Sequence, residues 1–341
     1  MKDPLRLIPL AVFCILALPA TLAEAQTATG DWTMQKAEAP GEVVLSISLG
    51  RDHGPSRSTS PWAKGSFEGL DFSQGSRREV RFSATREAGR FDFEGYLAGS
   101  EGAGLFRFSP DAAFPRDMEA LGFPIDERDQ LHMAVHDVTT GFAREMQGAD
   151  LAGLDGDALL ALRIHGADLA YIEELRAAGC EIESSDLLIA FRVHGITPAW
   201  VRALESDGLT PDDSKLIAMK VHGVSPSWIR EIAELGYSGV SEDKLIAFRV
   251  HGIDPAYIGA LQEVGYDDLK ADRLIAFKVH GTTADFIREI QDLGFAPGVD
   301  EVIALRVHGV TPEFVESLGS EAVQRGISYV LETKILGGSR R

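Results

Sequence analysis

The chain is poor in cysteine. It has two cysteines in 341 residues, and one of them, Cys14, lies in the apolar stretch near the amino terminus. Cys180 is therefore the only thiol expected in the mature protein, which excludes an internal disulfide and leaves packing as the source of stability. Because Cys180 ends a repeat helix, we expect it to be a small buried hydrophobic residue.

Long hydrophobic runs are also scarce, and the one clear run is at the amino terminus. Lys2 and Arg6 precede the apolar residues 7–18, and the small-x-small triplet 23–25 follows. This order is typical of a secretory signal peptide cleaved before Gln26. The alternative, a membrane anchor, needs roughly 20 apolar residues. We therefore expect a signal peptide over 1–25, no membrane span after its removal, and a periplasmic or secreted protein.

Positive charge is in short supply. The formal net charge is −19, and almost all of it lies in residues 111–341, whereas residues 26–110 are nearly neutral. An acidic surface repels phosphate backbones, so the composition argues against a nucleic-acid partner.

Motifs that carry chemistry are missing. The sequence has no G-x-S-x-G, Walker or EF-hand pattern. His132 and His136 have the spacing of the zincin H-E-x-x-H motif, but Met133 stands where the catalytic glutamate belongs, so we interpret the pair as fortuitous. We predict no catalytic residue, no cofactor and no metal site.

Residues 31–109 alternate with the period of strands. The segments 42–49, 79–86, 90–97 and 104–110 place Val80, Phe82, Phe91, Phe93, Leu105 and Phe108 between polar residues. Period-two alternation with short glycine-containing connections predicts an antiparallel sheet with one buried face. Residues 50–65, rich in Ser, Pro and Gly, are predicted to form a long loop.

One phrase recurs every 28 or 29 residues after the predicted sheet. It reads LLIAFRVHGITPAWV around His194 and LIAFRVHGIDPAYI around His251, and a degenerate copy surrounds His136. A fixed period predicts a repeat array, and such arrays bind through an extended surface.

Each unit is written as two helices and a tight turn. Ser225 is suited to cap the second helix, Pro226 to occupy its first position, and Gly236 to end it. Val224 and Ile229 occupy the two positions of a hydrophobic staple. The helix over 244–251 is apolar on nearly every side, so we expect neighbouring units to cover it.

These patterns predict an α+β protein, with a small antiparallel β-domain followed by an α-solenoid of paired-helix repeats. We expect the β-domain over 26–110 and the array, of about seven units, over 111–319. The remaining residues, 320–341, are predicted to hold a capping helix and a tail.

A histidine stands at the same place in every unit. The row consists of His136, His165, His194, His222, His251, His280 and His308. Zinc ligands must lie about 2.0–2.1 Å from one ion, whereas stacked helices are about 8–10 Å apart. We therefore predict a structural role, in which each imidazole bonds a free carbonyl at a helix end.

A basic residue precedes each histidine by two positions. This basic row consists of Arg163, Arg192, Lys220, Arg249, Lys278 and Arg306. It is a candidate binding stripe on an otherwise acidic array. The alternative is that the row pairs with carboxylates of the next unit.

The phrase VHG-[IVT]-[TSD]-P-x-[WYF]-[IV] resembles helical repeats of uncharacterised secreted bacterial proteins. It also resembles the extracytoplasmic tails of membrane zinc metallopeptidases of the beta-lactam-sensor type. The resemblance covers roughly residues 90–318 and transfers no catalytic residue, because the peptidase motif is missing. A likeness of VHGITPAWV to the repeat junction of TAL-effector proteins is interpreted as convergent turn chemistry.

We therefore expect a non-catalytic interaction or sensing scaffold of the bacterial envelope that binds another protein through the repeat surface. The competing hypothesis is an enzyme with its site where the sheet meets the helices. There Asp111, Asp117, Asp126 and His132 would have to converge around a deep pocket.

Overall fold

A computed structural model describes residues 27–49 and 57–338. The predicted signal peptide, with Cys14 and its cleavage site, lies outside the described residues. Among the helices of the described part, none has the length and apolar character needed to cross a membrane. The chain divides into two compact units. Of the described residues, those up to 120 and 124–137 belong to unit 1, and 121–123 and those from 138 onward belong to unit 2.

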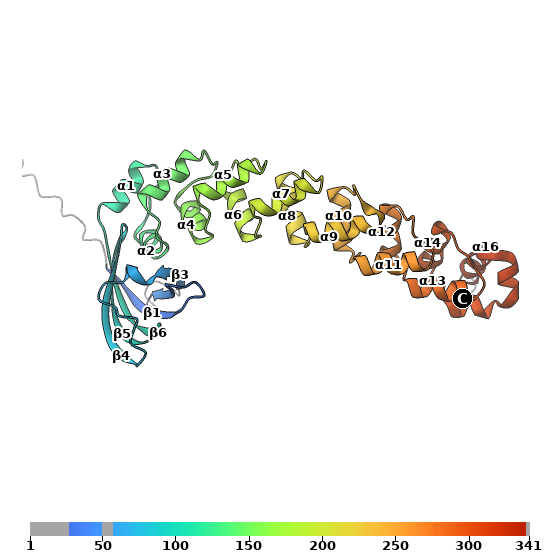
Figure 1. The fold of residues 1–341 in the computed structure, drawn as a ribbon, viewed down its shortest axis with the longest axis horizontal. Coiled ribbons are helices and arrows are strands. Elements are labelled where there is room, and N and C mark those ends of the chain that lie inside the picture. Colours follow the sequence, from blue (N-terminus) through green and yellow to red (C-terminus); the bar gives the residue numbers. More distant parts are fainter. Residues whose placement is uncertain (1–26, 50–56, 339–341) are drawn as a thin grey trace, which may run out of the picture. The chain divides into compact units, whose positions relative to one another are not determined.

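Unit 1 is built on a six-stranded antiparallel sheet with the order β3-β2-β1-β6-β5-β4 (Figure 1). Three strands fall on predicted segments with small changes at their ends, and β2 coincides with its segment. The strands are β1 (Ala28–Lys36), β2 (Glu42–Leu49), β3 (Arg57–Ala63), β4 (Arg78–Arg86), β5 (Gly89–Ala98) and β6 (Glu101–Pro110).

Aromatic rings form the core of unit 1. Trp32 meets Phe82 edge-on at 5.3 Å, and Phe82 stacks on Phe93 at 4.7 Å between ring centroids. Trp62 stacks on Phe67 at 5.5 Å. Period-two alternation places these residues on one face of the sheet, where such ring pairs add to the burial of apolar area.

The prediction of a loop over 50–65 is wrong for residues 57–63, which form β3. Composition misled because Ser and Pro are common in loops, whereas β3 is an edge strand, where a proline without an N–H is tolerated. Pro61 pairs in register with Val44, and its neighbour Trp62 is 1% exposed. The buried Trp62 therefore secures this strand.

The buried face of β6 also differs from the prediction. Leu105, expected inside, is 55% exposed, while Phe106 and Phe108 are buried. Leu105 and Phe106 are both apolar and adjacent, so either one could have pointed towards the core. A shift of one residue in strand register exchanges the two faces of a strand. Pairing of Phe106 with Phe93 fixes the register.

Two helices belong with the sheet: α1 (Phe114–Ala120) and α2 (Glu127–His136). Gln130 is buried in α2, and its Nε2 donates to the carbonyls of Ala88 and Asp111, at 2.8 Å each. The sheet unit therefore continues past residue 110, where the sequence placed the boundary.

Unit 2 is the array of paired helices (Figure 1). The first helices of the complete units, called A helices below, are α4 (Gly156–Ile164), α6 (Ser185–Val193), α8 (Asp213–Val221), α10 (Glu242–Val250), α12 (Ala271–Val279) and α14 (Val299–Val307). The second helices, called B helices, are α5 (Leu169–Ala177), α7 (Pro198–Ser206), α9 (Pro226–Ile232), α11 (Pro255–Glu263), α13 (Ala284–Asp292) and α15 (Pro312–Ser317). Helix α3 (Thr140–Gly148) precedes them, and a π-turn, η3 (Ala233–Tyr237), follows α9.

The turns carry the predicted signals. Ser225 accepts from the Trp228 amide at 3.2 Å, and Pro226 is the first residue of α9. Gly236 has φ 98°, a left-handed conformation that ends the helix at little steric cost to glycine. Val224 and Ile229, the staple pair, are both buried. The predicted repeat of two helices joined by a tight turn is confirmed.

The helices lie in two layers, because A helices contact A helices of neighbouring units and B helices contact B helices. The predicted capping helix is present as α16 (Gly319–Gly338), which is broken at Gly326, where φ is 78°. The predicted α+β class, with an antiparallel sheet followed by paired helices, is confirmed.

Candidate functional site

The basic row lies between successive units of the array. Each cation stands over the aromatic ring of the preceding B helix, or of α3 for the first of them. The pairs and their distances to the ring centroid are Arg163–Phe142 5.2 Å, Arg192–Tyr171 3.5 Å, Lys220–Trp200 4.7 Å, Arg249–Trp228 5.2 Å, Lys278–Tyr257 4.0 Å and Arg306–Phe286 4.7 Å. Cation–π contacts within about 6 Å are attractive, so the row links each unit to the one before it.

Two of the arginines also bond the end of the preceding A helix. Arg249 Nε donates to the carbonyl of His222 at 3.2 Å, and Arg306 Nε donates to that of His280 at 3.3 Å. A cation at a helix carboxyl end is favoured by the helix dipole. Burial lowers the pKa of Lys220, as expected for an ammonium group held between two units.

Carboxylates pair with a different set of cations. Lys215 meets Asp243 at 3.4 Å, and Lys244 meets Asp272 at 2.9 Å, both at the amino ends of A helices. Arg273 and Asp300 repeat the contact at 2.8 Å. The expected pairing between units therefore exists at the opposite end of the A helices, and the role of the basic row as a binding stripe stays a prediction.

The repeat histidines stand where the sequence placed them. From His165 to His308 each is the residue that follows an A helix, and its backbone N–H bonds the carbonyl four residues earlier. The side chains are exposed. Within the described residues, none of these six imidazoles bonds a helix-end carbonyl; for His222 and His280 an arginine of the next unit does so. His136 differs, because it ends α2 in unit 1.

A second row, which the sequence did not reveal, lies directly before the histidines. One large apolar residue per unit is about half exposed at the end of each A helix. The exposed row consists of Ile164 49%, Val193 55%, Val221 56%, Val250 54%, Val279 55% and Val307 53%. We expected neighbours to cover the A helix on all sides, but they cover only its Leu and Phe positions, such as Leu245 and Phe248.

The exposed row belongs to a wider face. In α10, Asp243, Ala247 and Val250 follow one another at i, i+4 and i+7, so they lie along one side of the helix. Asp243 and Val250 are exposed, and Ala247 and its neighbour Ile246 are half-buried. The same stripe recurs in the other A helices, with Ser214 in place of the acid in α8. We call this surface the A face.

His132 and His136 are brought together around one hydroxyl. Ser58 Oγ lies 3.2 Å from His132 Nδ1 and 3.0 Å from His136 Nε2. Burial lowers the pKa of His132, and burial together with His132 lowers that of His136 to about 4. The two histidines therefore join α2 to β3 through the Ser58 hydroxyl.

Two of the carboxylates considered for an enzyme site, Asp111 and Asp126, accept hydrogen bonds from backbone amides. Asp126 caps α2 by accepting from the amides of Arg128 and Asp129, at 2.8 Å each. Asp111 accepts from the Ala113 amide at 2.7 Å. A hollow of about 480 Å³ beside Asp126 has an apolar floor that includes Phe108 and Leu131. In the described part of the chain, no three His, Cys, Asp or Glu residues are grouped to hold a metal ion.

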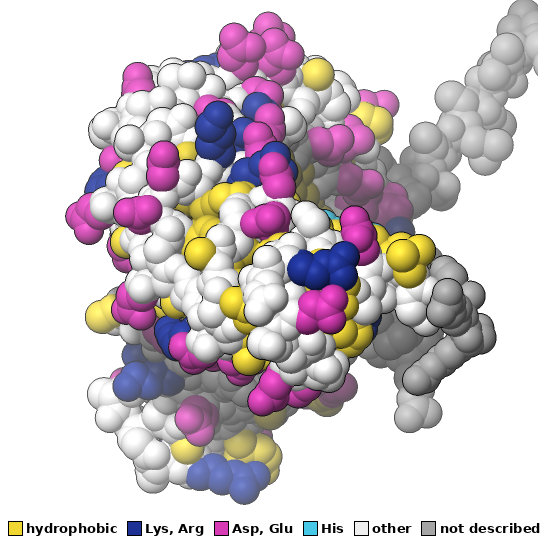
Figure 2. All heavy atoms as spheres, turned by 90° about the vertical axis from the view of Figure 1, so that its right-hand side faces the viewer, with side chains coloured by type: hydrophobic (Ala, Val, Ile, Leu, Met, Phe, Trp, Pro, Cys, Tyr) yellow, Lys and Arg dark blue, Asp and Glu magenta, His cyan; other side chains and the backbone are white. Residues whose placement is uncertain are grey.

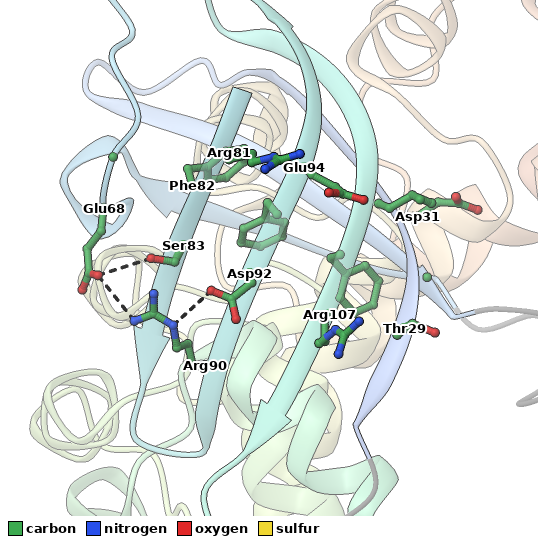
Figure 3. Close-up of a pocket in the computed structure, with 15 residues that line it drawn as sticks. Thr29, Asp31, Glu68, Arg81, Phe82, Ser83, Arg90, Asp92, Glu94 and Arg107 are labelled. Atoms are coloured by element: carbon green, nitrogen blue, oxygen red, sulfur yellow. Dashed lines mark hydrogen bonds and ion pairs between the residues drawn. The ribbon is translucent and has the colours of Figure 1, made fainter. Parts of the chain in front are cut away.

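A hollow of about 930 Å³ lies on the polar face of the sheet (Figure 3). Arg90 pairs there with Asp92 at 3.1 Å and with Glu68 at 3.6 Å, while Arg81 and Arg107 project from neighbouring strands. Guanidinium and carboxylate groups alternate over this face. Such a mixture selects neither an anion nor a cation.

Cys180 is buried, as the sequence predicts, with 6% of its surface exposed. Burial raises the pKa of its thiol to about 11. A protonated, covered thiol is a poor nucleophile, so this residue acts as a packing group.

In comparisons with known proteins, no family model matches the chain, and no curated protein matches it. The candidate functional surface therefore rests on geometry alone.

Proposed function

We propose that this protein is a non-catalytic interaction or sensing scaffold, exported to the bacterial envelope, that binds another protein through its helical array. The observation that supports the proposal most is the exposed row. Monomeric soluble proteins rarely expose large contiguous apolar surface without a binding role. Here six A helices each present an exposed Ile or Val at the same position.

The charges around the array fit a protein partner better than a polyanion. Acidic side chains are spread over the end of the array that Figure 2 faces, with hydrophobic side chains open to solvent between them. Among the A helices, basic groups of the basic row lie at one end and acidic groups at the other. Such a rim gives orientation and selectivity to an apolar contact.

Affinity capture from envelope extract tests the proposal. The chain is used as bait beside a variant in which Val221, Val250 and Val279 are replaced by Gln. Glutamine favours helix and has no charge, so the array should fold as before. We expect the variant to lose the proteins that the unaltered chain captures.

A control variant carries the same three replacements elsewhere. Ala177, Ser206 and Ser238 are exposed on or next to B helices, so their change to Gln should leave capture intact. Equal capture by all three baits would refute binding through the A face.

A further inference from the structure

We infer that the partner of the A face is a second copy of this chain, packed so that the A helices of the two copies run antiparallel. This inference rests on the proposed function, because it names the protein that the same surface binds. Two features of the A face carry it: its spacing of charge and its small central residues.

The charges of the A face are arranged symmetrically about its alanine row. In α10, Asp243 lies four residues before Ala247, and His251 lies four residues after it. The same order holds for Asp186, Ala190 and His194 in α6. It recurs in α4, α12 and α14, while α8 has Ser214 at the acidic position.

A two-fold axis along the array, through the alanines, makes use of this symmetry. It reverses each A helix of the second copy, so that Asp243 of one copy comes beside the Val250–His251 end of the other. Acid then meets imidazole at both rims, and antiparallel helices also place opposite dipole ends together. A two-fold axis across the array would instead place acid against acid, which is unfavourable.

The carboxylates at the acidic edge of the A face can each accept a further hydrogen bond. Asp243, Asp272 and Asp300 each accept one cation from the preceding unit, yet their side chains remain 74%, 74% and 77% exposed. A carboxylate has about four lone-pair sites. These groups can therefore accept a bond from a second chain.

The centre of the face permits close approach. Ala218, Ala247 and Ala276 are half-buried, and the larger Val residues flank them. Small residues at a crossing bring two helices near enough for the flanking side chains to interdigitate. The contact would cover the exposed row, whose residues are 49–56% exposed.

Light scattering during size-exclusion chromatography tests the association. We expect the purified chain to have about twice its monomer mass at micromolar concentration. The variant with Gln at Val221, Val250 and Val279 should dissociate at least about a hundred-fold more readily, because each copy then buries three amides in place of apolar groups. The control with Gln at Ala177, Ser206 and Ser238 should remain dimeric. A monomeric unaltered chain, or a dimer that the variant with Gln at Val221, Val250 and Val279 also retains, would overturn the inference.

Cross-linking tests the antiparallel arrangement. The two-fold axis along the array brings Ala247 of one copy opposite Ala247 of the other, so Ala247→Cys should form a disulfide between copies under mild oxidation. Ala256→Cys, on the exposed side of α11, should not. A dimer in which Ala247→Cys fails to cross-link would reject this packing.

The two proposals fail in different ways. If the chain is monomeric but the Val-to-Gln variant loses a different captured protein, binding through the A face stands and the second copy is excluded. If that variant changes neither mass nor capture, both proposals fall.

Discussion

The sheet unit and the array bury their apolar residues in different ways. In unit 1 a single cluster of rings, including Trp32, Phe82 and Phe93, is shared by most strands. In the array the A and B helices pack against those of the neighbouring repeats, and the same cation–ring contact recurs along the chain. A change in the cluster should therefore affect a whole unit, whereas a change in the array should stay local.

The largest effect is expected in the ring cluster. Phe93 is 2% exposed and packs against several rings. Phe93→Ala should lower the free energy of unfolding of unit 1 by about 3–5 kcal/mol, since it leaves a cavity among rings that are held by the sheet. Chemical denaturation followed by near-ultraviolet circular dichroism measures the change, and a loss below 1 kcal/mol would contradict it.

The matching change in the array is Ile229→Ala. Ile229 is 8% exposed on α9, so its truncation should cost about 2–5 kcal/mol. Because the loss falls on the neighbouring helical repeats, the thermal transition of the array should broaden or split, while the sheet domain, unit 1, is unaffected. Hydrogen exchange resolves which helices open. Uniform loss of protection along the whole array would show that the units do not respond locally.

A smaller effect is expected from pH in unit 1. His136 has an ordinary pKa of 6.5 that folding lowers to about 4. Stability is therefore complete above pH 6.5 and falls as the pH drops towards 4, because the unfolded chain takes up the proton first. The loss amounts to at most about 3 kcal/mol and is reduced by solvent screening.

The control for this pH effect is His136→Gln, which cannot titrate. Unfolding of unit 1 should then depend less on pH between 6.5 and 4.5. If the variant and the unaltered chain lose the same stability over this interval, another group is responsible.

The smallest effect per residue is expected in the basic row. Arg249→Gln removes the contact with the Trp228 ring and the bond to the His222 carbonyl. An exposed cation–π pair contributes about 0.5–1 kcal/mol, so the melting temperature of the array should fall slightly. No fall in Arg249→Gln, together with a loss of partner binding, would favour the binding-stripe hypothesis.

Much of this fold follows from periodicity in the sequence. The 28- or 29-residue period predicted the paired helices, the Ser225 and Pro226 signals predicted where α9 begins, and Gly236 predicted where it ends. Edge strand β3 could not be predicted in the same way, because the pairing of Pro61 and the burial of Trp62 depend on strands far along the chain. Local composition does not contain that information.

The candidate surface was less predictable than the fold. The basic row and the histidine row can be recognised in the sequence, whereas the exposure of Val250, between Arg249 and His251, cannot, because apolar helix residues are usually covered. A helical wheel contains a signal for this exposure, because it places Val250 on the same side of α10 as Ala247 and the charged Asp243. Exposure depends on how the units stack, which one unit alone does not reveal.

The central claim assigns different roles to residues that are neighbours in the chain. The side chains of the basic row stabilise the array, and those of the exposed row bind a second copy of the chain. Two variants test it in parallel. One carries Gln at Lys220, Arg249 and Lys278, and the other carries Gln at Val221, Val250 and Val279, each the next residue in the chain. The measurement is molecular mass by light scattering, with the melting temperature recorded on the same samples. We predict that the first variant melts lower and stays dimeric, while the second becomes monomeric and loses only the stability that association contributes. The reverse pattern would contradict the account.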